Sequence, residues 1–336
     1  MIEQGQTAAA TLEPITSGKR SNLVDLVKGL AIILVVYGHT QQGVLHRGWW
    51  SGPWAGFTES FIYSFHMPAF FFVSGLFVIG SIQRRGPRNF TLEKVKTILY
   101  PYLLFAVIGA ALGPVTAPFQ VTHSPFHWNM FLQNVADGSA SWFLFTLFFC
   151  LLLALFTVRL PNWLRFLLSV LLGIAPLYGT YITDRVMREF CFLAAGMWVG
   201  TQIFRLEHVQ KWVAAVGFVL LATLQFAAIY FYGYVVRWTY IELGLTGTAA
   251  LFLLARLLES HRIGDALVWV GRASLAIFLL SAFPQGATRV VLSNFFHTNN
   301  LWLQLLLPTF FATLLPAIVW YQQDRWRLGW LFHWPF

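Results

Sequence analysis

Apolar residues form long runs that recur from Leu23 to the C-terminus of this chain. Several runs are close to the ~20 residues that an α-helix needs to cross the hydrocarbon core of a bilayer. Residues 1–21, by contrast, are rich in Gln, Thr, Ser and Gly. The pattern predicts about ten transmembrane helices, near residues 23–44, 60–82, 97–117, 142–158, 164–181, 188–204, 212–232, 239–258, 267–287 and 301–321.

The composition agrees with an all-α, polytopic integral membrane protein. Hydrophobic residues make up 57% of the chain and charged residues 10%, whereas soluble domains have about 25% charged residues. We expect a disordered cytoplasmic tail over residues 1–21, one transmembrane domain over 22–322 and a short cytoplasmic tail over 323–336. Cys150 and Cys191 lie inside predicted spans and indicate no disulfide framework.

The net charge of +9 is distributed unequally between the two sides of the predicted membrane domain. Fifteen Lys and Arg residues lie on the side of the N-terminus and five on the other side. The positive-inside rule therefore predicts that both termini are cytoplasmic. We expect the protein in a cell membrane (inner or plasma membrane). Because the charge sets topology, we expect no nucleic-acid partner. The fifteen are Lys19, Arg20, Arg84, Arg85, Arg88, Lys94, Lys96, Arg159, Arg165, Arg205, Lys211, Arg256, Arg262, Arg325 and Arg327, and the five are Arg47, Arg185, Arg188, Arg237 and Arg289.

The first predicted helix contains three ionisable side chains, Asp25, Lys28 and His39. Charges within a span are costly and need a reason. At about 100° per residue the three share one stripe, which rises about 16 Å from Lys28 to His39. Asp25 and Lys28 also fit an ordinary ion pair near the cytoplasmic interface. His39 favours a functional role, because an imidazole in hydrocarbon needs polar partners inside the bundle.

The second predicted helix carries another histidine beside a proline. Pro68 lacks an N–H and predicts a bend close to His66. His66 is expected at about the same depth as His39, so that the two histidines line one outer cavity. Ser74 and Gly75 follow, and they fit close helix packing as readily as chemistry.

These residues resemble the signature of the membrane-bound acyltransferase-3 family, in its fucose 4-O-acetylase-like and exopolysaccharide O-acetyltransferase branch. The first motif corresponds to Arg20, Asp25, Lys28 with Gly29, and His39, and the second is the Phe-His-Met-Pro run from Phe65 to Gly75. Weaker matches follow along nearly the whole chain. The sequence departs from the family at Ser281, where members commonly carry a histidine.

The resemblance implies transfer of an acyl group, usually acetyl from cytoplasmic acetyl-CoA, to a sugar hydroxyl of a glycan or glycolipid. His39 is then the expected general base, and Asp25 and Lys28 position it or the donor. We expect acyl-CoA as a co-substrate, with no metal and no bound cofactor. The expected substrate-binding residues are His66, Arg20, Arg84, Arg85, Ser74, Trp142 and Glu242.

Two other functions fit the same intramembrane residues. A transporter or flippase would use them as a proton relay or substrate path, although the sequence has no inverted repeat. A sensor or scaffold without catalysis is the third reading, suggested by Ser281. The basic residues from Arg84 to Lys96 have an alternative too, since they also serve to set topology.

Overall fold

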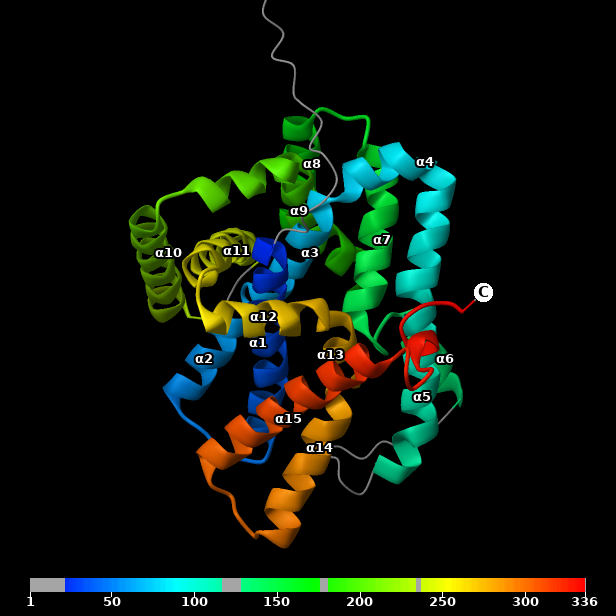
Figure 1. Cartoon of the computed structure of the whole chain (residues 1–336), viewed down its shortest axis with the longest axis vertical. Coiled ribbons are helices and arrows are strands. Elements are labelled where there is room, and N and C mark those ends of the chain that lie inside the picture. Colours follow the sequence, from blue (N-terminus) through cyan, green and yellow to red (C-terminus); the bar gives the residue numbers. More distant parts are fainter. Residues whose placement is uncertain (1–21, 117–127, 176–180, 234–236, 336) are drawn as a thin grey trace, which may run out of the picture.

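The structure is a computed structural model and describes residues 22–116, 128–175, 181–233 and 237–335. Every regular element in these residues is helical, which confirms the all-α prediction (Figure 1). In the first part of the chain the helices are α1 (Asn22–His46), α2 (Pro53–Tyr63), α3 (His66–Leu76), α4 (Val78–Lys94), the π-helical segment η1 (Val95–Leu99), α5 (Tyr100–Thr116), α6 (Trp128–Ala136), α7 (Trp142–Thr157) and α8 (Asn162–Ile174). They are followed by α9 (Tyr181–Val199), η3 (Gly200–His208), α10 (Lys211–Tyr232), α11 (Arg237–Leu258), α12 (Arg262–Arg272), α13 (Ser274–Leu280), α14 (Ala282–Val290), η4 (Val291–Phe295), α15 (Leu301–Gln322) and η5 (Gly329–Leu331).

Several of these helices have the length and composition of membrane spans, so the chain is a multi-pass membrane protein. Within the described residues, five helical segments qualify as single spans, and a bent pair formed by α12 and α13 makes a sixth. The helices α7 and α8 are apolar but shorter. The number of about ten spans and the cytoplasmic termini stay predictions. The five segments are Asn22–His46, Val78–Gly113, Lys211–Tyr232, Thr239–Leu258 and Leu301–Gln322.

The predicted second helix is three helices in the structure. The chain leaves helical geometry at Phe65, whose φ of −138° separates α2 from α3. Pro68 is the third residue of α3, where its missing N–H belongs to the first turn and leaves no intrahelical bond unmade. A second break follows at Phe77, before α4. The proline therefore accompanies a helix start rather than a kink within one long helix.

The predicted ninth helix is also interrupted. At Ala273 the axis bends by 62° between α12 and α13, and α14 begins after Ser281. Ser281 is buried, with 9% of its surface exposed. This departure from the family therefore lies inside the packed protein, at a junction of two short helices.

Helix α1 passes through the centre of the molecule, with α12, α15, α3 and α11 packed around it (Figure 1). Two glycines bring α1 and α12 into backbone contact. A Cβ on Gly29 would overlap the carbonyl oxygen of Leu267, and a Cβ on Gly271 would overlap that of Asp25. Small residues of this kind let membrane helices approach closely. The contact fixes the N-terminal half of α1 against the start of the bent pair.

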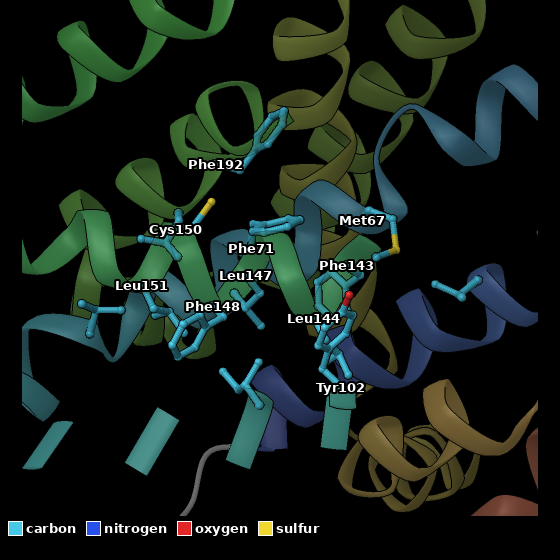
Figure 2. Close-up of a cluster of buried hydrophobic side chains, with 14 of the residues drawn as sticks. Met67, Phe71, Tyr102, Phe143, Leu144, Leu147, Phe148, Cys150, Leu151 and Phe192 are labelled. Carbon is cyan, nitrogen blue, oxygen red and sulfur yellow. The ribbon is translucent and has the colours of Figure 1, made fainter. Parts of the chain in front are cut away.

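An apolar core surrounds the middle of α1. Ile32, Val35 and Val36 are at most 2% exposed and belong to a cluster with side chains of α3, α7, α9 and α13. Figure 2 shows part of this cluster, in which Met67 and Phe71 of α3 face the leucines and phenylalanines of α7. Cys150 and Cys191 lie in the same cluster as buried free thiols, as expected for cysteines that act as small hydrophobic residues.

Candidate active site

A cavity of about 740 Å³ opens beside the N-terminal end of α1. Side chains from α1, α3, α4 and α7 contribute to its lining, and four of them are cations. We call it the cation cavity. Five of the residues predicted from sequence meet in it, although they come from positions up to sixty residues apart. The five are Asp25, Lys28, Ser74, Arg84 and Arg85, and the fourth cation is Lys94.

Asp25 is the central anion of this region and has 1% of its surface exposed. Its Oδ1 is 2.7 Å from Lys28 Nζ, as expected for the i,i+3 pair, and its Oδ2 is 3.2 Å from Arg272 Nε of α12. Arg272 also donates to Asn22 Oδ1 over 3.3 Å. A buried carboxylate with two cationic partners is held firmly in place. The ion pair ties α1 to α12 and directs Lys28 into the cavity.

The basic segment predicted as a loop is helical. Gly86 has a φ of 72°, which interrupts α4, and Pro87 follows it. Positive φ is a conformation that glycine adopts without cost. Because of this turn, α4 presents Arg84 and Arg85 before the bend and Lys94 after it to one cavity.

One acidic residue partly balances these cations. Glu93 pairs with Arg85, and its other oxygen is 3.7 Å from Lys94 Nζ. Arg84 donates through Nε to the carbonyl of Gly80 over 3.1 Å. The cavity thus has more positive than negative side chains, since Asp25 and Glu93 face four cations. Such a wall favours a ligand with several negative charges.

The sequence left open whether Ser74 and Gly75 serve helix packing or chemistry, and the structure places the two residues differently. Ser74 lines the cation cavity, and its hydroxyl donates to the carbonyl of Phe70 over 2.8 Å. A Cβ on Gly75 would overlap the carbonyl oxygen of Leu193, and one on Gly196 would overlap that of Phe72. Gly75 is therefore a packing residue between α3 and α9, whereas the neighbouring serine contributes to the cavity.

His39 lies near the other end of α1, and its side chain is exposed. Its ring is 6.4 Å from the ring of Tyr63 at an angle of 82°. A side-chain hydrogen bond joins it to Gln42 on the same helix. His39 is thus held on one side and open on another, which suits a group that meets a substrate.

His66 lies near His39, since both rings contact Tyr63, but its side chain is buried instead of lining an open cavity. Only 2% of the surface of His66 is exposed. Tyr63 lies between His66 and His39, and the ring centroids of Tyr63 and His66 are 4.9 Å apart. Its Nδ1 is 2.6 Å from the carbonyl oxygen of Ile62. Because a carbonyl only accepts, Nδ1 carries the proton. His66 caps the C-terminal end of α2 and supports Tyr63, and it does not share an open cavity wall with His39.

The apolar core interrupts the polar stripe that the sequence predicted along α1. At 100° per residue, Ile32 and Val35 fill the stripe between Lys28 and His39, and both are buried in the core. The cation cavity and His39 are consequently separated along α1 by a packed apolar layer. A continuous polar path between them is absent along the described face of α1.

The remaining predicted site residues lie elsewhere. Trp142 starts α7 and stacks under Arg185, whose Cζ is 4.2 Å from the ring centroid. Glu242 is exposed on α11. Arg20 lies outside the described residues. Neither Trp142 nor Glu242 lines the cation cavity.

Several residues of these two regions were missed at the level of sequence. Arg272 was missed because its partner Asp25 is 247 positions away, and no local pattern joins them. Gln42 and Glu59 look like ordinary polar residues near a membrane interface. Only the helical spacing from His39 to Gln42, three residues, hinted that the two side chains are neighbours.

The helical fold defines a multi-pass membrane protein, with a cavity lined by four cations at one end of α1 and an exposed histidine near the other end. Comparison with known proteins identifies the class: the chain belongs to the acyltransferase-3 family, whose model, described as an acyltransferase domain, matches residues 22–321.

Two curated relatives share part of this sequence, and both are named nodulation protein NolL. The protein from Sinorhizobium fredii is 32% identical over 110 residues, which cover 32% of this chain and 27% of that protein. The protein from Mesorhizobium japonicum is 31% identical over 98 residues, or 28% of this chain and 25% of that protein. The chain spans about a quarter of the length of these relatives. No solved structure matches the chain.

Proposed function

We propose that this membrane acyltransferase transfers an acyl group, most simply acetyl, from cytoplasmic acyl-CoA to a sugar hydroxyl of an exported glycan or glycolipid, at the cell membrane. The observation that carries the proposal is the cation cavity, where Lys28, Arg84, Arg85 and Lys94 converge. Coenzyme A carries several phosphate charges, and Lys and Arg side chains are the groups that bind phosphate. The positive-inside rule, which predicts a cytoplasmic N-terminus, supports a cytoplasmic location for this cavity at the N-terminal end of α1.

His39 is the proposed general base. Its nitrogen takes the proton of the sugar hydroxyl while the oxygen attacks the thioester carbonyl. The carbon–sulfur bond then breaks, and the coenzyme A thiolate takes up the proton that the imidazole releases. The base thus returns to its starting state, and the products are the sugar ester and free coenzyme A. The exposure of His39 supports this role, because the acceptor must reach the ring.

The apolar layer adds a requirement to this mechanism. The phosphates bind at one end of α1 and the thioester reacts near the other, about 16 Å away along the helix. The acyl-bearing arm of the donor must therefore pass the side chains around Ile32 and Phe71. The proposal accordingly includes an opening of this layer when the donor binds.

The test is acyl-CoA-dependent labelling of surface glycans in membranes that carry the intact protein or its His39→Ala variant at matched expression. His46→Ala is the control, because His46 is an exposed histidine on the same helix. We expect incorporation with the intact protein and the control, and none with His39→Ala. Incorporation that survives His39→Ala would refute the assigned base. Absence of incorporation from acetyl and succinyl donors with several acceptors, together with measurable substrate flux, would favour transport instead.

A further inference from the structure

His39 belongs to a chain of three polar side chains that starts on α1 and ends on α2. Gln42 lies one turn after His39, on the same face of α1, and a side-chain hydrogen bond joins the two residues. Beyond it, Gln42 Nε2 donates to Glu59 Oε1 over 3.1 Å. The order is therefore imidazole, amide, carboxylate, with the carboxylate farthest from the exposed ring.

The chemistry of the three groups fixes the direction of each hydrogen bond. An ionised carboxylate only accepts, so Gln42 turns its NH₂ group toward Glu59. With one hydrogen of this NH₂ group bound to Glu59, the arrangement that completes the chain turns the amide oxygen of Gln42 to His39, which offers its N–H to that oxygen. A neutral imidazole has a single N–H, so its other nitrogen carries a lone pair. This is the form of histidine that accepts a proton from a substrate.

We propose that Gln42 and Glu59 are positioning residues that hold His39 in the tautomer and orientation required of a general base. The inference rests on the proposed role of His39 and names two residues that act through it. No proton leaves Gln42 during the reaction. When the ring becomes positive, the negative charge of Glu59, aligned through the Gln42 amide dipole, stabilises it.

The neighbouring glutamine shows why Gln42 is more than a clamp between helices. Gln41 Nε2 already joins α1 to α2, since it donates to the carbonyl of Ala55 over 2.9 Å and to Thr58 Oγ1 over 2.8 Å. Gln41 is fully buried, whereas Gln42 is only partly buried. Of the two adjacent amides, Gln42 alone contacts both a carboxylate and the histidine. The packing contact and the functional contact are thus carried by different residues.

Other titratable groups near His39 have partners of their own. Tyr63 of α2 and His66 of α3 stack against each other. Arg289 of α14 donates from Nη2 to the carbonyl of Thr40 over 2.9 Å. For Glu59, the chain through Gln42 is the hydrogen-bonded connection to the ring that the structure records.

The experiment measures kcat and the two KM values of the full-length protein in detergent or liposomes, with acetyl-CoA and the glycan acceptor found by labelling. The variants are Gln42→Leu, Glu59→Ala, the double variant, and Glu59→Gln, whose amide oxygen still accepts from Gln42. A misplaced base typically costs about 100-fold in rate. We expect Gln42→Leu and Glu59→Ala each to lower kcat by about that factor with both KM values unchanged, and Glu59→Gln to lose less.

Two further features separate positioning from a loss of structure. The double variant should lose no more activity than either single variant, because residues that act as one unit are not additive. Gln304→Leu is the control: this buried amide of α15 donates to Ser293 Oγ and to the carbonyl of Thr298, and neither partner belongs to α2. We expect it to keep the normal kcat while lowering the unfolding midpoint.

The outcomes also distinguish this inference from the proposed function. If His39→Ala keeps transfer activity, the assigned base is wrong, and the positioning role of Gln42 and Glu59 is wrong with it. If His39→Ala abolishes transfer but Gln42→Leu and Glu59→Ala keep the normal kcat, only the positioning role of Gln42 and Glu59 is refuted. A rise in acceptor KM without a change in kcat would also refute it, because Glu59 would then bind substrate. Should Gln42→Leu fail to fold, Glu59→Gln and Glu59→Ala still decide, since Glu59 lies partly exposed on α2.

Discussion

The two ends of α1 both carry polar side chains, but these are held by different chemistry. At the N-terminal end Asp25 is paired with Lys28 and Arg272, and further cations from α4 face the same cavity. At the C-terminal end the contacts are mostly made by neutral amides and hydroxyls, such as the bond of Gln285 Nε2 to Thr40 Oγ1 at 2.6 Å. Ion pairs predominate at the N-terminal end, whereas hydrogen bonds predominate at the other end, where Arg289 and Glu59 also take part.

This difference matches the two substrates that we propose. A coenzyme with several phosphates needs cations, and its affinity falls as salt screens them. A sugar hydroxyl carries no charge, and a histidine that acts as a base must stay neutral until it takes the proton. Cations packed beside the ring would oppose protonation. The apolar layer around Ile32 and Phe71 keeps the two environments apart.

The largest effect is expected at the ionic end, from Asp25→Ala. Asp25 is 1% exposed, and its removal leaves Lys28 and Arg272 without the carboxylate that pairs them. Loss of one partner from a fully buried ion pair typically costs about 3–5 kcal/mol, and the partial exposure of Lys28 and Arg272 places the expected cost near the lower end. We therefore expect a loss of about that size in the free energy of unfolding, measured by denaturant titration in detergent micelles.

The control for this change is Asp324→Ala. Asp324 is exposed after α15, and an exposed substitution usually alters stability by less than about 0.5 kcal/mol. If both variants unfold at the same denaturant concentration, the ion pairs of Asp25 do not stabilise the fold. The N-terminal end would then be no different in energy from the exposed surface.

A smaller effect is expected in the cation cavity, from Arg84→Gln. The substitution removes one of the four cations that line it. A charge-assisted contact to phosphate is worth about 1.5–3 kcal/mol, which corresponds to a rise in the KM for acyl-CoA of about tenfold or more. We expect kcat to stay unchanged and the effect to shrink in high salt.

Arg88→Gln is the matched control, since Arg88 is exposed on the same helix α4 and does not line the cavity. Its KM should equal that of the unchanged protein. An equal rise in both variants would mean that α4 acts through its overall charge. The cavity would then have no role as a defined binding site.

The sequence predicted the ends of α1 better than the path between them. The long apolar run placed the helix at 23–44, against Asn22–His46 in the structure, and the cost of buried charge pointed to Asp25 and His39. The same helical wheel that aligned these residues also holds Ile32 and Val35 between them. A polar stripe was therefore inferred from its two ends alone, although its apolar middle was already visible.

The helix breaks and the long-range partners were harder to predict. A break at Phe65 follows from how α2 and α3 pack, and the nearby proline indicates only that some irregularity is close. The pairing of Asp25 with Arg272 and of Gln42 with Glu59 depends on tertiary packing between separate helices. Pairings between membrane helices are especially hard to predict, because surfaces that face lipid and surfaces that face protein are equally apolar.

The smallest effect is expected at the neutral end, from Thr40→Val. The Thr40 hydroxyl accepts from Gln285 over 2.6 Å and lies 3.2 Å from Thr309 Oγ1, so the change removes hydrogen bonds between helices at almost constant volume. We expect a loss of about 1 kcal/mol in unfolding free energy. Thr313→Val is the control, because the Thr313 hydroxyl bonds only its own helix, at the carbonyl of Thr309. The loss at Thr40 should be the same in low and high salt, whereas the effect of Arg84→Gln should shrink with salt, because Arg84 is exposed. A salt dependence at Thr40 equal to that at Arg84 would remove the contrast between the two ends of α1.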